Sequence, residues 1–521
     1  MGLSSALSSG ILSNLSLECV SKGRLLAKVL PLSRSNGYPL INTFYQPEFE
    51  AVLLEGLQRF SCVEVRFQHT LEALEQSTES IIVSIRTPTG TLQQVQCAYL
   101  LACDGGRSMV RRSLNIPLQG ATFAQRWLVI DAICGEGTAP VVTIFCNPQR
   151  PAVAIPAPHN RRRWEFMLLP GETEKDLLEP TTISALLQQY TPRKTTASAG
   201  PYHIQIVRQA IYTFHAARAK SFSQGRVFLL GDAAHMMPPF GGQGLNSALR
   251  DAQNLAWKVA MVLQAGDHKG SSLLTSYHEE RSRHAARMVA FASILGALFM
   301  STARPLAYCR NLLIRMLHQG DHQDPATLSP SYHIRGNLLM RMKPQAKYRA
   351  GFFLGEVTGK HSGRDKSGPY GRLFKRRGPI YRAHVGSLLP QPEVITRQGQ
   401  RVLLDEVLGT GFALLRRHAN PEEAFAKVQS DFWQQLGARL VCIQTEDPPK
   451  KSGVGARFIA PTGSQALPIV VVRSMDKDFL SKSRDCFVVV RPDRFILGVF
   501  KEEKANAFES ALQRLLYSDG E

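Results

Sequence analysis

The residues best suited to ligand chemistry lie in the middle of the chain. The stretch GRVFLLGDAAHMMPPFGGQGLNSALRDAQNLAWK, residues 225–258, places Gly231 and Asp232 at the end of an apolar strand pattern. A glycine-rich turn follows, and a helical pattern begins near Leu245. An acid at the carboxyl end of a strand can accept hydrogen bonds from ribose hydroxyls, and glycines let backbone amides approach an anion. The start of a helix adds a positive dipole end. This order favours a ligand site over a plain strand-turn-helix packing unit.

A second acidic turn ends an earlier strand pattern. In LLACDGGRSMVRRSL, Asp104 and Gly105 follow the apolar run directly, and Ser108 and Arg111 come next. The two stretches together closely resemble motifs of the flavin-dependent aromatic hydroxylases, the single-component FAD monooxygenases. Residues 225–266 resemble their second FAD-binding motif. The earlier stretch resembles their Asp-Gly motif, which is credited with roles in both FAD and NAD(P)H binding.

Further segments resemble one branch of this family, the hydroxyphenylpropionate hydroxylases. These segments include FCNPQRP, RRRWEFMLLPGE, YTFHAARA, LLPQPEV and VVVRPDRF. YQPEFEAVL resembles the helix whose glutamine, here Gln46, reaches the FAD. The resemblance therefore implies that NADH or NADPH reduces FAD and that one atom of O2 is transferred to a phenolic or other aromatic substrate. It also implies these cofactor-binding residues: Gln46, Asp104, Gly105, Arg111, Gly231, Asp232, Pro239, Gly242, Gln243, Gly244, Leu245 and Asn246.

No catalytic side chain and no metal site are assigned. His215, in the strand pattern YTFHAARA, has an ordinary pKa suited to accepting a proton, and it is retained as a weak catalytic candidate beside a purely structural role. Strand alternation would put Tyr212 and Phe214 on one face and His215 on the other. The run Arg161 to Arg163 either attracts a carboxylated substrate or forms a solvated turn.

The fold class implied is α/β with α+β elements. We expect an incomplete Rossmann-like FAD-binding domain, an antiparallel-sheet substrate domain and a C-terminal thioredoxin-like domain. The expected boundaries are residues 1–118 and 216–360 for the two parts of the FAD-binding domain, 119–215 for the substrate domain and 380–521 for the C-terminal domain. The glycine-rich and basic residues 359–382 predict a linker.

Local patterns predict the elements that hold these motifs. Residues 45–60 have helical apolar spacing with Pro47 in the first turn. Strand patterns at 63–67, 80–87 and 92–98 indicate an antiparallel ribbon that leads back into a central sheet. Strands between 119 and 217, a helix at 180–190, long helices between 245 and 300 and a single helix over 421–440 are also expected.

The sequence contains no GxGxxG, the turn that holds the ADP half of FAD in relatives. The resemblance begins near Gly2, where relatives have already passed that βαβ unit. Three explanations stay open: a misplaced start, a truncated paralogue, or FAD held by the remaining half-site. The alternative function is therefore a catalytically impaired remnant or assembly partner.

Composition indicates which classes of binding partner and which cellular compartment to expect. Lys plus Arg number 62 and Asp plus Glu 42, so the net charge is +20, but the charge is dispersed and no nucleic-acid-binding motif occurs. We therefore expect a small aromatic substrate and no nucleic acid. The nine cysteines form no CxxC, which favours a reducing cytoplasm. The apolar residues 288–300 are too few to span a bilayer, so no stable membrane insertion is expected, and they are a possible homodimer contact.

Overall fold

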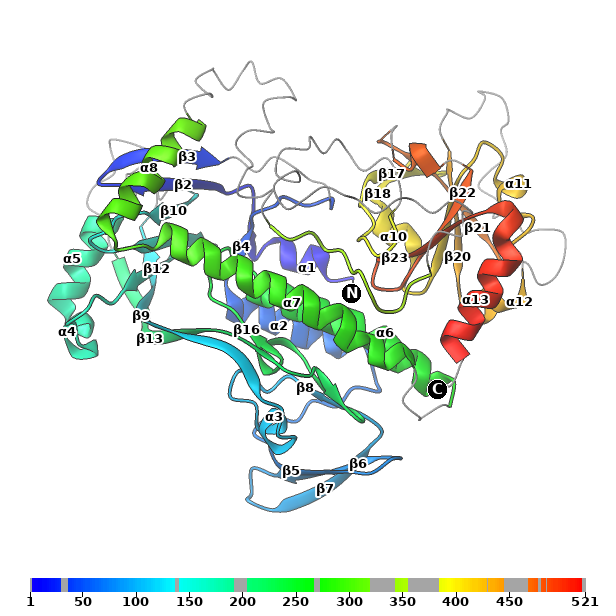
Figure 1. Cartoon of the computed structure of the whole chain (residues 1–521), viewed down its shortest axis with the longest axis horizontal. Helices are drawn as coiled ribbons and strands as arrows, with labels where there is room; N and C mark the ends of the chain where they lie inside the picture. The colour runs from blue at the N-terminus through cyan, green and yellow to red at the C-terminus, as the bar shows by residue number, and fades with distance from the viewer. Residues whose placement is uncertain are drawn as a thin grey trace.

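The computed structural model describes residues 2–29, 36–135, 140–191, 204–266, 272–318, 343–354, 384–428, 430–444, 467–476, 479–483 and 485–517. The described part is mixed α/β, which confirms the expected class (Figure 1). The expected linker at 359–382 lies outside the described residues.

The largest element is an eight-stranded, mainly antiparallel sheet. In its central strands, side chains on opposite faces belong to two separate buried apolar clusters, so the middle of the sheet is covered on both sides. The parallel pair of Val141–Phe145 with Ser16–Ser21 is the exception to the antiparallel pairing. In spatial order the strands are β16 (His235–Met236), β13 (Ile204–Ala219), β9 (Leu118–Cys134), β12 (Arg161–Met167), β11 (Ala152–Ala157), β10 (Val141–Phe145), β2 (Ser16–Ser21) and β3 (Arg24–Val29).

Three smaller sheets carry the remaining strands before residue 244. One has the order β14 (Ser223–Gln224), β15 (Val227–Leu229) and β8 (Leu100–Ala102), and its β15 and β8 are parallel. Another is the antiparallel ribbon β5 (Thr70–Gln76), β6 (Ile81–Arg86) and β7 (Leu92–Cys97). In the third, β1 (Ile11–Leu12) pairs with β4 (Thr43–Phe44).

Long helices lie between the eight-stranded sheet and the C-terminal domain (Figure 1). α6 (Gly244–Gln264) follows the glycine-rich turn, and α7 (Ser272–Phe299) packs against α6. The face of α7 that holds Met288 and Phe291 packs against Trp127 of the eight-stranded sheet. The other helices in this part are α1 (Ser4–Ser8), α2 (Gln46–Leu57), α3 (Met109–Ser113), α4 (Glu174–Leu178), α5 (Pro180–Tyr190) and α8 (Arg304–His318).

The C-terminal domain is built on a seven-stranded mixed sheet. β19 (Ala413–Arg417), β20 (Arg439–Gln444) and β21 (Ile469–Ser474) run parallel in the middle. The outer strands pair antiparallel: β17 (Glu393–Thr396) and β18 (Arg401–Leu403) at one edge, β22 (Cys486–Val490) and β23 (Ile496–Lys501) at the other. Its helices are α10 (Leu404–Leu408), α11 (Pro421–Phe425), α12 (Asp431–Gln435) and α13 (Ala505–Tyr517). Its likeness to thioredoxin stays a prediction.

Two local expectations were wrong. Residues 63–67 form no strand although Val63, Val65 and Phe67 alternate, because these side chains are exposed and no neighbouring strand pairs with them among the described residues. The first ribbon strand is β5 instead, which β6 pairs along its whole length. Residues 421–440 form the two short helices α11 and α12 rather than one. The eight-stranded sheet also includes β2 and β3, which precede residue 119, and the domain boundaries stay a prediction.

The apolar stretch 288–300 packs largely against other parts of the same chain. Met288, Phe291, Leu295 and Phe299 are buried in one cluster with residues of the eight-stranded sheet, whereas Ile294 is 55% exposed. No single helix in the described ranges is long and apolar enough to cross a membrane. α7 and residues 304–316 of α8 pass that test only as a pair, with a bend of 102° between them.

Candidate functional site

The two predicted motifs meet at the carboxyl ends of neighbouring parallel strands. β8 pairs with β15 in the register Leu101 to Phe228 and Ala102 to Leu229, and the Leu230 N–H donates to the Ala102 carbonyl at 3.0 Å. The acidic turns after the two strands, at Asp104 and Asp232, therefore lie at the same edge of this sheet. In α/β folds such an edge is the usual place for a bound nucleotide.

Arg111 ties the two turns together. Its guanidinium donates from Nη1 to the Ala233 carbonyl and from Nη2 to the Gly106 carbonyl, both at 2.9 Å. The side chain is buried, and burial lowers its pKa. Ser108 caps the short helix α3 by accepting the Arg111 N–H at 2.9 Å, which fixes the backbone that carries the guanidinium. The structure thus gives Arg111 a bridging position between the two motifs.

A buried acid, to which the sequence motifs gave no role, holds the turn after β15. Asp251 of α6 accepts the Gly231 N–H at 3.0 Å and a hydrogen bond from His235 Nε2 at 2.8 Å. Arg281 of α7 donates to it from Nε at 2.6 Å. Burial alone would raise the pKa of Asp251, but Arg281 and His235 hold it below its ordinary value. A charged residue at a buried position of the helical pattern was the signal that could have identified it.

Gly231 needs a left-handed backbone conformation, with φ of +56°, to make this turn. The turn leaves the Asp232 side chain exposed, while Ala233 and Ala234 are buried. Nearby protein removes water from one side of the Asp232 carboxyl and raises its pKa, an effect that His235 opposes. The carboxylate is therefore available to a ligand at the sheet edge.

The glycine-rich loop ends at the first turn of α6. Gly242 has φ of +61° and Gly105 has φ of +76°, and a Cβ at either position, or at Gly244, would meet no atom within 4 Å. The Gly242 N–H is bound to the Pro239 carbonyl at 2.8 Å. This open backbone and the amino-terminal end of a 21-residue helix can receive an anionic group.

Other residues of the loop hold its shape. Gln243 donates from Nε2 to the Gly241 carbonyl at 2.6 Å, and its buried Oε1 has no hydrogen-bond partner among the described residues. Asn246 donates to the Gly242 carbonyl at 3.0 Å, and Leu245 is 45% exposed. An unpaired buried acceptor, open glycines and an exposed carboxylate on one edge fit a bound dinucleotide such as FAD.

The two other predicted contacts have protein partners. Asp104 accepts the Val110 N–H at 3.1 Å and so caps α3, although its side chain remains exposed. Gln46 is exposed at the first position of α2 and donates to Glu50 Oε1 at 2.7 Å. No ligand is needed to explain either of these contacts.

The glycine loop also packs against the eight-stranded sheet. Phe240 lies with its ring centroid 5.7 Å from Trp127 and 6.1 Å from Phe214. This face of the sheet therefore adjoins the loop, while the opposite face, with Trp164 and Phe166, packs against α5. The structure brings an aromatic surface beside the candidate cofactor loop.

His215 lies in strand β13 of the sheet and shares a cavity with Gly106 of the Asp-Gly turn. Its Nδ1 is 3.0 Å from Thr122 Oγ1 on the neighbouring strand β9, and a bulge between Thr213 and His215 interrupts the strand pairing here. His215 lines a cavity of about 600 Å³ together with Gly106, Arg107 and Met236. The Thr122 contact gives one ring nitrogen a hydrogen-bond partner within the protein. This contact fits the purely structural role that is the alternative to catalysis for His215.

The basic run is not a solvated turn, because Arg161 to Arg163 lie in strand β12. Arg163 forms a bidentate pair with Asp131, with distances of 2.7 and 2.9 Å. Arg161 lies 3.5 Å from Glu48 and stacks over Tyr45 at 4.0 Å. Acidic side chains of the same chain therefore already neutralise two of these arginines.

Comparisons with known proteins identify the family of the chain. Residues 9–292 match the model of an FAD binding domain family, and residues 386–515 match that of the HcaD C-terminal domain. In fold, the chain resembles the flavin-dependent monooxygenase PieE in complex with FAD and substrate, with a TM-score of 0.73 and 20% identity over 99% of this chain and 90% of that one. It also resembles aklavinone-11 hydroxylase in complex with FAD and aklavinone, with a TM-score of 0.70 and 20% identity over 99% and 88%.

Relatives of higher identity include a 3-(3-hydroxy-phenyl)propionate/3-hydroxycinnamic acid hydroxylase of Klebsiella pneumoniae. It is 34% identical over 491 residues, which make up 94% of this chain and 80% of the relative. A protein of the same name from Escherichia coli is 34% identical over 91% of this chain and 77% of its own length. The chain therefore belongs to the family of FAD-dependent aromatic hydroxylases.

Proposed function

We propose that this chain hydroxylates a phenolic ring, with FAD bound at the edge of β8 and β15 and with NADH or NADPH as the reductant. The observation that carries the proposal is the convergence of two acidic turns and an open glycine loop at that edge. The family membership supports the reaction class. The names of the relatives favour a phenol that bears a short carboxylated side chain.

The residues divide into ligand-contacting and supporting roles in this proposal. Asp232 would accept hydrogen bonds from the ribose or ribityl hydroxyls of FAD, because its carboxylate is exposed at the strand end. Gly242, Gly244 and the first turn of α6 would lie against the pyrophosphate or the flavin ring. Arg111 and Asp251 would hold the two turns in place without touching the cofactor.

FAD, when bound, would supply the redox chemistry of the hydroxylation. The chain itself must hold the aromatic substrate and keep water from the reacting atoms. Phe240 of the glycine loop packs on Trp127 and Phe214 of the eight-stranded sheet, and these apolar side chains exclude water from that side of the loop. We retain His215 only as a candidate for moving a proton.

The test is a titration of the purified full chain with FAD, followed by visible absorption. A shifted, structured flavin spectrum is expected, and NADH or NADPH oxidation should rise when 3-(3-hydroxyphenyl)propionate is added. Absence of binding at high FAD would favour the alternative function, a catalytically impaired remnant or assembly partner. A homodimer stays a prediction, and light scattering on the same preparation would test it.

A further inference from the structure

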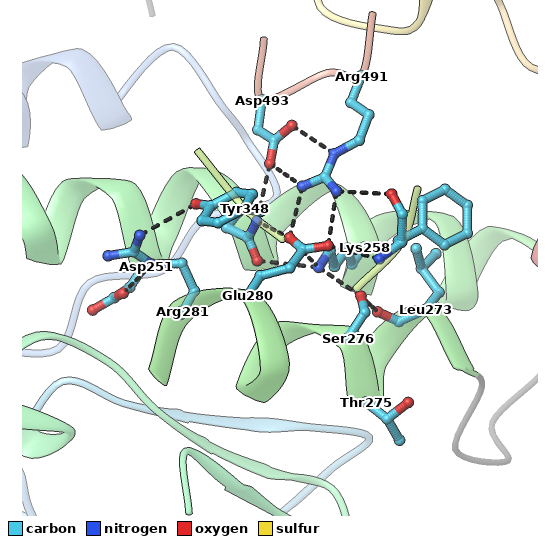
Figure 2. Close-up of polar contacts among 12 residues, drawn as sticks. Asp251, Lys258, Leu273, Thr275, Ser276, Glu280, Arg281, Tyr348, Arg491 and Asp493 are labelled. Atoms are coloured by element: carbon cyan, nitrogen blue, oxygen red, sulfur yellow. Dashed lines mark hydrogen bonds and ion pairs between the residues drawn. The ribbon is translucent and has the colours of Figure 1, made fainter. Parts of the chain in front are cut away.

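A buried ionic cluster joins the C-terminal domain to α7 (Figure 2). Arg491, in the turn between β22 and β23, donates to both carboxylate oxygens of Glu280 at 2.8 Å. It also pairs with Asp493, and Asn254 of α6 donates to both Glu280 and Asp493, at 2.6 and 3.0 Å. Glu280, Arg491 and Asp493 are each at most 1% exposed. The contact is thus a fully desolvated one between segments more than two hundred residues apart in sequence.

The charges in this cluster balance. Lys258 lies 3.1 Å from Glu280 and donates to Ser276 at 2.7 Å, so two cations face the two acids Glu280 and Asp493. Burial lowers the pKa of Lys258 to about 8, and Glu280 opposes that effect. Removing one member leaves an uncompensated buried charge, which is costly in a low-dielectric interior. The cluster therefore fixes the C-terminal turn rigidly on α7.

The next residue on α7 continues the contact toward the cofactor turn. Arg281 donates to Asp251 at 2.6 Å and to the carbonyl and hydroxyl of Ser247, both at 3.1 Å. Asp251 in turn holds the Gly231 N–H. Two adjacent residues of α7 thus have different partners: Glu280 binds the C-terminal domain, and Arg281 binds Asp251, which holds the turn after β15.

A second link runs through Tyr348. Its hydroxyl accepts a hydrogen bond from Arg281 Nη1 at 3.2 Å, and its ring stacks on Phe495 of the C-terminal domain with centroids 4.1 Å apart. The Tyr348 N–H donates to the Gly386 carbonyl, also in the C-terminal domain, at 2.8 Å. Arg281 is therefore held by the C-terminal domain as well as by α6.

We propose that Arg491 is a positioning residue, through which the C-terminal domain holds the turn at residues 229–236 in the shape that binds FAD. The path is Arg491 to Glu280, along one helical step to Arg281, then to Asp251 and the Gly231 amide. This gives the C-terminal domain a role in cofactor binding although none of its described residues lies at the sheet edge. The FAD-affinity part of the inference rests on the proposed function, whereas the shape of the turn can be tested without FAD.

The experiment compares Arg491→Met with wild type by amide hydrogen exchange on the full, FAD-free chain. We expect exchange in a peptide covering residues 229–236 to speed up by about fivefold or more, the lower range of measured couplings between sites. The dissociation constant of FAD should rise by a similar factor. Because coupling is reciprocal, FAD should slow exchange at residues 487–499 in wild type and not in the variant. Arg491→Lys should restore part of both effects, because it retains the charge that faces Glu280.

Arg494→Met is the matched control. Arg494 lies three residues away and is bound to Asp405 and to the Gly409 carbonyl, both within the C-terminal domain. It should leave exchange at 229–236 and FAD affinity unchanged. The proposal is overturned if both variants accelerate the turn equally, or if Arg491→Met accelerates exchange uniformly over the chain. Failure of wild type to bind FAD would refute the proposed function instead, while the FAD-free exchange would still decide the coupling.

Discussion

Replacing Glu280 by glutamine removes one buried charge while keeping the shape of the side chain. Burial alone would raise the pKa of Glu280, but Arg491 and Lys258 lower it from the ordinary 4.5 to about 2. Each pKa unit corresponds to about 1.4 kcal/mol, so the folded state gains about 3 kcal/mol from the ionised carboxylate. Breaking a buried ion pair typically costs about 3–5 kcal/mol, which agrees with this value.

The sign of the pH dependence follows from the lowered pKa. The stabilisation is fully present above the unfolded-state pKa and is lost as the pH falls toward the folded-state pKa. The difference in unfolding free energy between wild type and Glu280→Gln should therefore be about 3 kcal/mol at about pH 7 and roughly half of that at about pH 3. Glutamine does not titrate, so the change comes from the wild-type protein.

Urea unfolding followed by tryptophan fluorescence measures this difference, since Trp257 lies beside Arg491, whose Cζ is 5.3 Å from the ring centroid. Glu502→Gln is the control. Glu502 pairs with Arg416 within the C-terminal domain but keeps 28% of its side chain exposed, so its loss should cost about 1 kcal/mol or less. Equal losses of stability in the two variants, or the same Glu280→Gln difference at both pH values, would show that an ionised, buried Glu280 does not stabilise the fold.

Two further predictions concern the cofactor edge. Asp232→Ala should raise the dissociation constant of FAD by about tenfold or more, because a charged hydrogen bond is worth roughly 1.5–3 kcal/mol; flavin fluorescence titration checks this, and an effect no larger than that of the exposed Asp431→Ala would contradict it. In Gly242→Val, backbone strain should lower the free energy of unfolding by about 1–2 kcal/mol. The loss of FAD-binding free energy should be larger than this, because the valine side chain fills the open space at the loop. Gly399→Val, at φ of +80° in equally open space in the C-terminal domain, should reproduce the strain without the loss of FAD, and equal affinities would exclude the loop as the binding surface.

The sequence predicted the elements whose signal is local. The helical spacing after Tyr45 and Leu245 became α2 and α6, and the apolar runs before Asp104 and Asp232 became β8 and β15. Residues 63–67 show where this fails. Alternation is typical of a half-buried strand, but a strand also needs a neighbouring strand to pair with. In this ribbon β6 pairs with β5 and not with residues 63–67.

The site was predictable as two motifs, and its supports were not. Nothing local in the sequence says that Asp251 meets the Gly231 amide, or that Glu280 meets Arg491 across the domain contact. These contacts depend on how two helices and a distant turn pack. The one available signal was a set of charged residues, Asp251, Lys258 and Glu280, at positions where the helices are buried.

We propose that this chain, with FAD at the edge of β8 and β15, transfers oxygen to an aromatic ring. The most direct test supplies isotopically labelled O2 to the FAD-loaded full chain with NADH or NADPH and 3-(3-hydroxyphenyl)propionate, and reads the product by mass spectrometry. We expect a ring-hydroxylated product that carries one labelled oxygen atom and whose amount falls in Asp232→Ala. Consumption of reductant by a flavin-bound chain with no labelled product from this or any related phenol would contradict it.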